Sequence, residues 1–106
     1  MLINLTLDAV QHIQSKGGQA AVDLLSFTSW GGNATEVSVD TRITRRDISM
    51  YRKIKQDGLE LFILPSLADH TTVMNIESKK FLFFRNLKAD LELENGIVLG
   101  RRTSWD

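Results

Sequence analysis

The amino-acid sequence predicts an α+β protein that is mostly β, with short mixed strands in a sheet or sandwich and one N-terminal helix. Residues 35–41 alternate between apolar or threonine side chains and polar ones, which is the period of a strand with one wet face. An Asp57-Gly58 pair lies between two short segments that are expected to be strands, and such a pair is typical of a β-hairpin turn. Residues 7–16 combine helical spacing of apolar side chains with cap residues at both ends.

A short strand around residues 2–5 leads into the predicted helix at residues 7–16. Thr6 offers a hydroxyl as the N-cap, and the carboxylate of Asp8 suits the positive end of the helix dipole. Gly17-Gly18 supplies the positive φ that a C-cap requires. One apolar stripe on this helix is expected to pack on the core: Ala9, Val10 and Ile13.

Residues 20–41 are predicted to form a hairpin with a glycine-rich bend. The segment 20–28 is dense in apolar side chains, which favours a buried strand over another helix. Residues 29–33 interrupt it with two glycines and an asparagine, and the alternating segment 35–41 follows.

Residues 42–56 are harder to assign, because the spacing within 47–56 fits a strand and one helical face equally well. The Asp57-Gly58 pair tolerates the positive φ values of a type I′ turn, so a hairpin that pairs 51–56 with 59–64 is favoured. Pro65 then suits the first position of a helical turn that ends near Thr71.

Three further strands are expected at residues 73–77, 80–85 and 90–94, and a last short strand at 97–99. The second of these is the most apolar, because it contains Phe81, Leu82, Phe83 and Phe84. Adjacent strand residues point to opposite faces, so both faces of this strand would need a cover. The helix can cover one face and a partner the other, which predicts a homo-oligomer or a protein partner.

The composition limits the classes of function. With 106 residues the chain is expected to form a single domain over 1–106. Thirteen basic residues balance thirteen acidic ones, so no overall field favours nucleic acid or a membrane. The start of the sequence lacks the basic and apolar segments of a secretion signal, so a cytoplasmic protein is expected.

Cysteine is absent from the sequence, which excludes disulfides, thiolate metal sites, cysteine-held iron–sulfur clusters and cysteine nucleophiles. His12 and His70 stand far apart in sequence, and neither has a serine at the spacing of a nucleophile motif. They are expected to be surface or cap residues, although Asp69 beside His70 can orient an imidazole. We therefore expect no enzyme activity, no metal site and no bound cofactor.

Two segments are candidate ligand or partner surfaces. The bend Ser29-Trp30-Gly31-Gly32 offers close backbone approach and an indole for stacking. The simpler explanation is a tight hairpin in which Trp30 closes the core or a dimer seam. Arg42, Arg45 and Arg46 carry guanidinium forks that fit oxyanions. The flanking residues Asp40 and Asp47 can neutralise them in a solvated loop instead.

The order of these elements resembles the HesB/IscA-like domain, the A-type family of iron–sulfur biosynthesis. Residues 5–10 resemble its opening, a Thr-capped helix with an early alanine, and residues 21–32 resemble its strand with a Gly-rich bend. Residues 57–67 resemble its Asp-Gly turn, apolar strand and Asp-Pro-Ser-Leu run, with Leu64 in place of the aspartate. Residues 81–86 resemble a late aromatic strand that ends in asparagine.

The resemblance implies the fold, and it also implies cluster ligands that this sequence lacks. The family uses one cysteine in the Gly-rich bend and a Cys-x-Cys pair near the C-terminus, whereas this chain has Ser29 in the bend and Ser104 in the tail. A serine hydroxyl ionises poorly and is a hard ligand for iron–sulfur chemistry. We expect a non-catalytic binding or scaffold module. The alternative is an accessory protein for cluster assembly or metal handling that uses non-cysteine or partner ligands.

Overall fold

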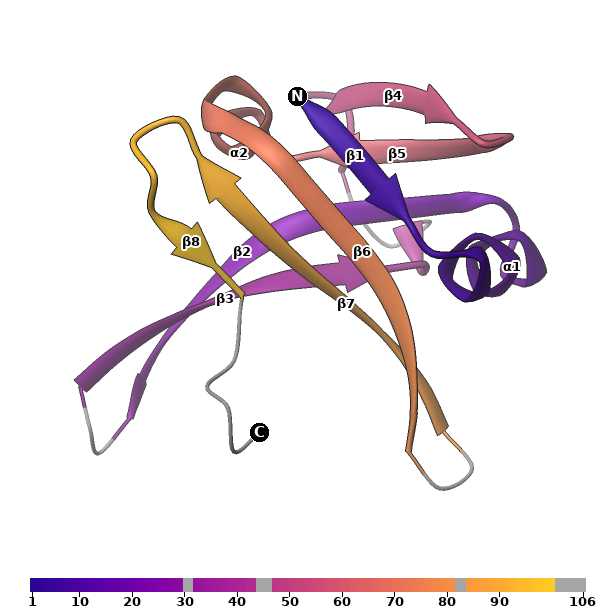
Figure 1. Cartoon of the computed structure of the whole chain (residues 1–106), viewed down its shortest axis with the longest axis horizontal. Coiled ribbons are helices and arrows are strands. Elements are labelled where there is room, and N and C mark those ends of the chain that lie inside the picture. Colours follow the sequence, from indigo (N-terminus) through magenta and orange to yellow (C-terminus); the bar gives the residue numbers. More distant parts are fainter. Residues whose placement is uncertain (30–31, 44–46, 82–83, 101–106) are drawn as a thin grey trace.

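Two four-stranded sheets face each other in the computed structural model, which describes residues 1–29, 32–43, 47–81 and 84–100 (Figure 1). Sheet A has the order β1 (Leu2–Leu5), β6 (Thr71–Phe81), β7 (Phe84–Leu93), β8 (Val98–Leu99). Sheet B has the order β3 (Gly32–Asp40), β2 (Gln19–Ser29), β5 (Leu59–Ile63), β4 (Arg52–Gln56). The pairs β1–β6 and β2–β5 are parallel, and the other pairs are antiparallel. The predicted α+β, mostly β class is confirmed.

Helix α1 (Leu7–Ser15) begins and ends where its cap residues predict. The hydroxyl of Thr6 accepts a hydrogen bond from the amide of Ala9 at 3.2 Å, and Gly17 and Gly18 both have positive φ. Ala9 and Ile13 are completely buried, so the helix is held by its apolar stripe. Within the described residues, no helix has the length and apolar character that crossing a bilayer requires.

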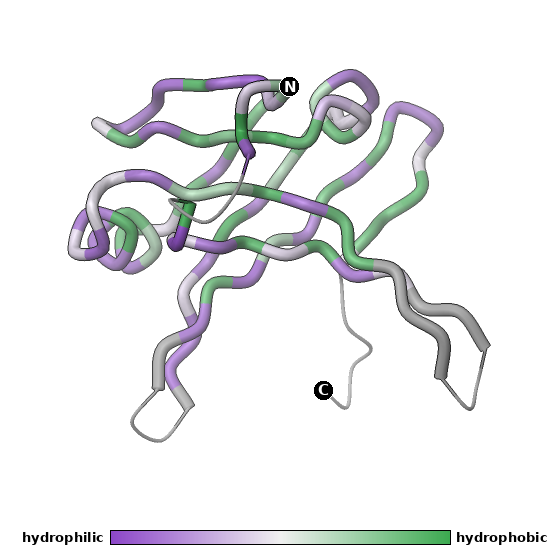
Figure 2. The backbone as a smooth tube through the Cα atoms, turned by 180° about the vertical axis from the view of Figure 1, so that it is seen from behind, coloured by the Kyte–Doolittle hydropathy of each residue, from purple (hydrophilic) through white to green (hydrophobic). Residues whose placement is uncertain are grey.

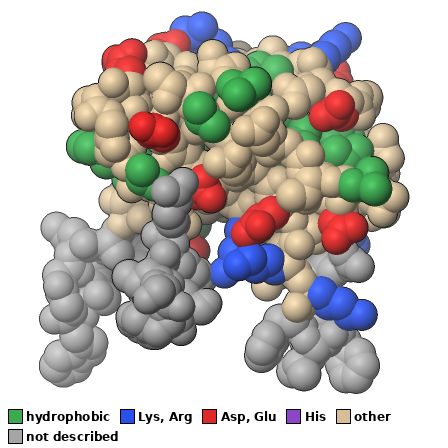
Figure 3. All heavy atoms as spheres, in the orientation of Figure 1, with side chains coloured by type: hydrophobic (Ala, Val, Ile, Leu, Met, Phe, Trp, Pro, Cys, Tyr) green, Lys and Arg blue, Asp and Glu red, His purple; other side chains and the backbone are tan. Residues whose placement is uncertain are grey.

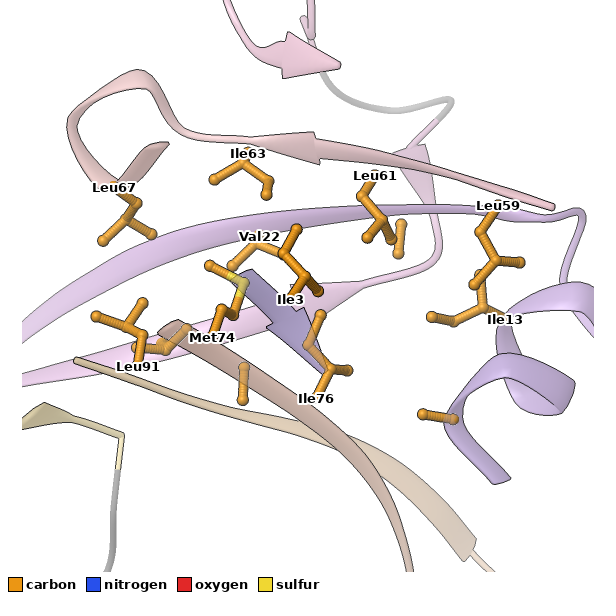
Figure 4. Close-up of a cluster of buried hydrophobic side chains, with 14 residues drawn as sticks. Ile3, Ile13, Val22, Leu59, Leu61, Ile63, Leu67, Met74, Ile76 and Leu91 are labelled. Atoms are coloured by element: carbon orange, nitrogen blue, oxygen red, sulfur yellow. The ribbon is translucent and has the colours of Figure 1, made fainter. Parts of the chain in front are cut away.

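The main core lies between the two sheets, and both sheets contribute alternate residues to it. Figure 2 shows hydrophobic and hydrophilic residues alternating along the strands, as one buried face requires. Figure 4 shows the larger side chains that meet there, among them Met74, Ile76 and Leu91 from sheet A, and Val22, Leu61 and Ile63 from sheet B. Pro65 predicted a helical turn, and helix α2 (Pro65–His70) is that turn. Its Leu67 side chain joins one end of the core.

The hairpin of β4 and β5 is confirmed. Asp57 and Gly58 have φ values of 53° and 76°, and Gln56 pairs with Leu59 across the two-residue turn. The spacing within residues 47–56 fitted both a strand and a helix. In the structure, residues 52–56 form strand β4, and residues 47–51 are neither helix nor strand.

Those residues cover part of the outer face of sheet B. Ile48 and Tyr51 pack against a small second cluster of Ala21, Ile43 and Phe62. The hydroxyl of Tyr51 donates a hydrogen bond to the buried carboxylate of Asp23. This contact ties the loop to the second strand of sheet B.

Two strands replace the three that were predicted between residues 73 and 94, and this prediction was wrong. Phe81 at the end of β6 pairs with Phe84 at the start of β7, so the predicted strand 80–85 contains a hairpin end. The segments Ser78-Lys79 and Asn86-Leu87-Lys88, which were expected to separate the strands, lie within β6 and β7. Their polar side chains are tolerated there because a strand of a two-sheet structure has one face that no second sheet covers. Leu82 and Phe83 lie outside the described residues.

The predicted strand at residues 20–28 is confirmed as part of β2, and its first residues are buried as expected. Ala20, Ala21, Val22 and Asp23 are buried, whereas Leu25 is 48% exposed. Strand β5 pairs with β2 only over residues 19–22, so the later part of β2 loses the cover of its neighbour.

A polar ladder crosses three strands on the outer face of sheet B. The side-chain amide of Gln19 donates to Glu60 at 2.8 Å, and the ammonium of Lys53 lies 2.6 Å from the other carboxylate oxygen. The hydrogen bond from Lys53, followed by that from Gln19, lowers the pKa of Glu60.

Replacing Lys53 by methionine should therefore raise the pKa of Glu60, which can be followed by the carboxyl carbon resonance in an NMR titration. Because the folded-state pKa is lowered, ionised Glu60 stabilises the protein above its ordinary pKa, and this contribution disappears as the pH falls through the lowered value. Lys53→Met should weaken that acid dependence. Lys55→Met is the matched control, since Lys55 acts on Glu60 only weakly through charge. An equal effect of both variants would refute the ladder.

Candidate binding site between two hairpin arms

In each sheet, two antiparallel strands extend beyond the parallel strand that pairs with one of them, which is β5 in sheet B and β1 in sheet A. In sheet B, residues 24–29 and 32–37 pair only with each other, and we call these two segments the first arm. In sheet A, β1 reaches only residues 73–76 of β6, so residues 77–81 and 84–88 form a second arm. Both arms project from the same side of the molecule, as the two opposite views agree (Figures 1 and 2).

A groove of about 290 Å³ lies at the base of the two arms. Strand β3 lines one side with Glu36, Val37 and Val39, and strand β7 lines the other with residues 86–89. Val37 and Ala89 are buried, while Glu36 and Asn86 are exposed. Figure 3 shows basic and acidic side chains on this side of the molecule between the projecting arms. The groove therefore has an apolar base and a rim of mixed charge.

Gly100 closes the groove at the end of β8 and fixes the direction of the chain there. Its φ is +81°, and a Cβ at this position would lie 2.3 Å from the carbonyl oxygen of Ala89. Only glycine fits this close approach without a shift of the backbone. The backbone that leads toward the C-terminal tail thus begins at the groove, and residues 101–106 lie outside the described part.

The sequence-predicted site residues are only partly described. Ser29 and Gly32 are register partners at the end of the first arm, beyond the groove lining. Trp30, Gly31, Arg45 and Arg46 lie outside the described residues. The structure therefore supports the bend as the end of an arm.

One of the carboxylates that flank Arg42, Arg45 and Arg46 contacts Arg42. The carboxylate of Asp40 accepts a hydrogen bond from the backbone amide of Arg42 at 2.9 Å and lies 3.5 Å from its guanidinium. Asp47 instead accepts hydrogen bonds from the hydroxyl and amide of Ser49, which lower the pKa of Asp47.

Neither histidine lines the groove. The Nδ1 atom of His70 lies 3.0 Å from Oε1 of Glu94, whereas its chain neighbour Asp69 pairs with Arg52 at 2.9 Å. In the part of the chain that the structure describes, no group of three His, Cys, Asp or Glu side chains is placed to hold a metal ion.

Sequence reasoning missed the lining residues Glu36, Asn86, Lys88 and Gly100. The first three belong to strands whose neighbours across the groove come from the other sheet, a relation that spacing along the chain does not contain. The glycine at position 100, directly after the last predicted strand, could have indicated a turn or a close backbone approach there.

Comparisons with known proteins agree with this architecture. A family model described as the CC/Se motif containing family matches residues 1–92. A crystal structure of Escherichia coli SufA, described as involved in biosynthesis of iron–sulfur clusters, superposes with a TM-score of 0.54 at 14% identity, covering 83% of this chain and 78% of SufA. A crystal structure of IscA with the [2Fe–2S] cluster gives 0.57 at 10% identity, covering 95% of this chain and 100% of IscA. Among curated proteins no match to the sequence was found. These likenesses show the HesB/IscA-like fold that the sequence motifs implied.

Proposed function

The chain belongs to the CC/Se motif containing family, and on that premise we propose that it is a non-catalytic binding or scaffold module that holds no iron–sulfur cluster of its own. One observation carries this proposal. The chain has the fold of a protein solved with a [2Fe–2S] cluster, yet its sequence contains no cysteine. It also cannot contain a pair of adjacent cysteines, although its family is named for a CC/Se motif.

The described residues of the groove do not fit a cluster. Its polar side chains are the carboxylate of Glu36, the amide of Asn86 and the ammonium of Lys88. Iron–sulfur clusters are held mainly by thiolates, which are soft ligands, and occasionally by imidazoles. An ammonium cannot ligate iron, and neither histidine lines the groove.

The two arms support a protein as the partner. Each is a lone two-stranded hairpin, a structure that is marginally stable in water unless something packs on it. In the sequence, five of the eight aromatic residues fall between positions 24 and 37 or between positions 77 and 88: Phe27, Trp30, Phe81, Phe83 and Phe84. Aromatic side chains are enriched where protein surfaces meet.

Charge favours a second copy of the chain as that partner. The second arm contains four basic residues, Lys79, Lys80, Arg85 and Lys88, and one acidic residue, Glu77, so its net charge is +3. The whole chain has net charge zero, so the rest of it carries −3. Two copies therefore offer each other opposite charges, which favours association.

Light scattering at micromolar concentration tests this association, and we expect a mass greater than that of one chain. Lys80→Glu, in the second arm, should lower the mass toward that of one chain, because it reverses a charge at the contact. Lys55→Glu makes the same change on an exposed residue of β4 and should leave the mass unchanged. A mass of one chain at every concentration, or equal effects of the two variants, would contradict the proposal.

The second candidate function is that of an accessory in cluster assembly, in which a partner protein supplies the thiolates. The observation that favours it is the fold shared with SufA and IscA. Under this alternative a cluster would form only in the presence of the partner.

A further inference from the structure

A second pocket, of about 350 Å³, lies between helix α2 and the turn that joins β7 to β8. It shares no lining residue with the groove between the arms. Four leucines form its apolar part: Leu24, Leu67, Leu93 and Leu99. Neither the family description nor the fold assigns this pocket a role.

The apolar part of the pocket is continuous with the main core. Leu67 is only 2% exposed and belongs to the core cluster, and the other three leucines are partly buried against it. An aliphatic group in the pocket would therefore extend the core and be stabilised by the removal of apolar surface from water. A cavity of about 150 Å³ accommodates benzene. A pocket of about 350 Å³ has room for a chain of about six to eight carbons.

The mouth of the pocket carries one fixed arrangement of polar groups. The Nδ1 atom of His70 lies 3.0 Å from Oε1 of Glu94, and the backbone amide of Glu94 donates to the carbonyl of His70 at 2.8 Å. These two bonds hold the β7–β8 turn against the end of α2. Both side chains are more than half exposed, at 61% and 63%, so a ligand can reach them.

The charge at the mouth selects the head group of a ligand. Among the residues that line the pocket, none is lysine or arginine, and the carboxylate of Glu94 is the acidic side chain. His70 engages only one of its two oxygens. A ligand with a carboxylate head would face Glu94 with like charge, whereas an ammonium would complement it.

We propose that this pocket binds a small aliphatic amine, with the alkyl chain on the four leucines and the ammonium on Glu94. The ligand class is thus a cationic amphiphile of low mass. This site is separate from the groove at the base of the arms, because the two linings have no residue in common.

An NMR titration with three six-carbon probes tests the proposal: hexylammonium, hexan-1-ol and hexanoate. The methyl resonances of Leu24, Leu93 and Leu99 report occupancy. We expect hexylammonium to bind about fivefold more tightly than hexan-1-ol, the gain of one solvent-exposed charged contact, and hexanoate to bind most weakly. Leu24→Gln should weaken all three probes, because it places an amide in the apolar part.

Glu94→Gln should abolish the preference of the pocket for hexylammonium over hexan-1-ol. Glu92→Gln is the matched control, since Glu92 is exposed, lies two residues away and does not line the pocket. The proposal is overturned if no probe shifts these methyl resonances, if hexanoate binds as tightly as hexylammonium, or if both glutamate variants lower the affinity equally.

Discussion

Replacing Gly100 by alanine should destabilise the protein by about 2–4 kcal/mol. Two costs add at this position. The φ of +81° is unfavourable for any residue with a Cβ, at about 1 kcal/mol or more, and the new Cβ would lie 2.3 Å from the carbonyl oxygen of Ala89. Because that oxygen belongs to the backbone of β7, relief requires β8 to move. Urea denaturation measures the loss, and the amide exchange of β8 should accelerate.

Gly96→Ala is the control for the conformational part of this cost. Gly96 also has a positive φ, +87°, but an added Cβ would meet nothing within 4 Å. Its substitution should therefore cost only about 1 kcal/mol. Equal losses in the two variants would show that the close approach of Gly100 to β7 is not a real constraint on the chain.

Replacing Leu61 by alanine should cost about 3–4 kcal/mol. Leu61 is completely buried on β5, an interior strand of sheet B, and lies in the core between the two sheets. Removing its branched end leaves a cavity that strands fixed on both sides of β5 cannot easily close. Chemical denaturation followed by circular dichroism measures the change.

Leu7→Ala is the matched control, because it makes the same substitution where the leucine is 71% exposed. Position 7 opens helix α1, where alanine is also a good helix former, so the change in stability should stay within about 0.5 kcal/mol. A comparable loss at both positions would mean that the core is not organised around β5 as described.

The parts of the fold that the sequence predicted correctly depend on local chemistry. Thr6 caps α1 because its hydroxyl lies next to the unpaired amides of the first turn. Asp57-Gly58 makes its hairpin because both residues adopt positive φ. Pro65 begins α2 because the first helical position has no partner for an N–H, which proline lacks. In each case the deciding interaction spans only a few residues of the chain.

The two errors have different causes. Residues 80–85 look like one apolar strand, but Phe81 pairs with Phe84 within sheet A, so the segment is divided between β6 and β7. The groove instead joins Glu36 of sheet B to Lys88 of sheet A, and no spacing along the chain connects them. The residues proposed from the bend alone, Ser29 and Gly32, consequently lie beyond the groove lining.

The proposed function rests on the absence of cysteine from a chain with this fold. The chain has the two-sheet body of this fold and no thiolate that could hold a cluster. Under the function we propose, the arms and the groove at their base contact another protein, and under the further inference the leucine pocket holds a small ligand.

Anaerobic reconstitution with ferrous iron and sulfide tests the central claim most directly. The purified chain, free of partners, is incubated, passed through a desalting column and examined for visible absorbance, with IscA treated in parallel as the positive control because its structure contains a [2Fe–2S] cluster. The account predicts that IscA keeps the chromophore and that this chain emerges colourless with no bound iron. A stable chromophore on this chain, with iron and sulfide in stoichiometric amounts, would contradict it.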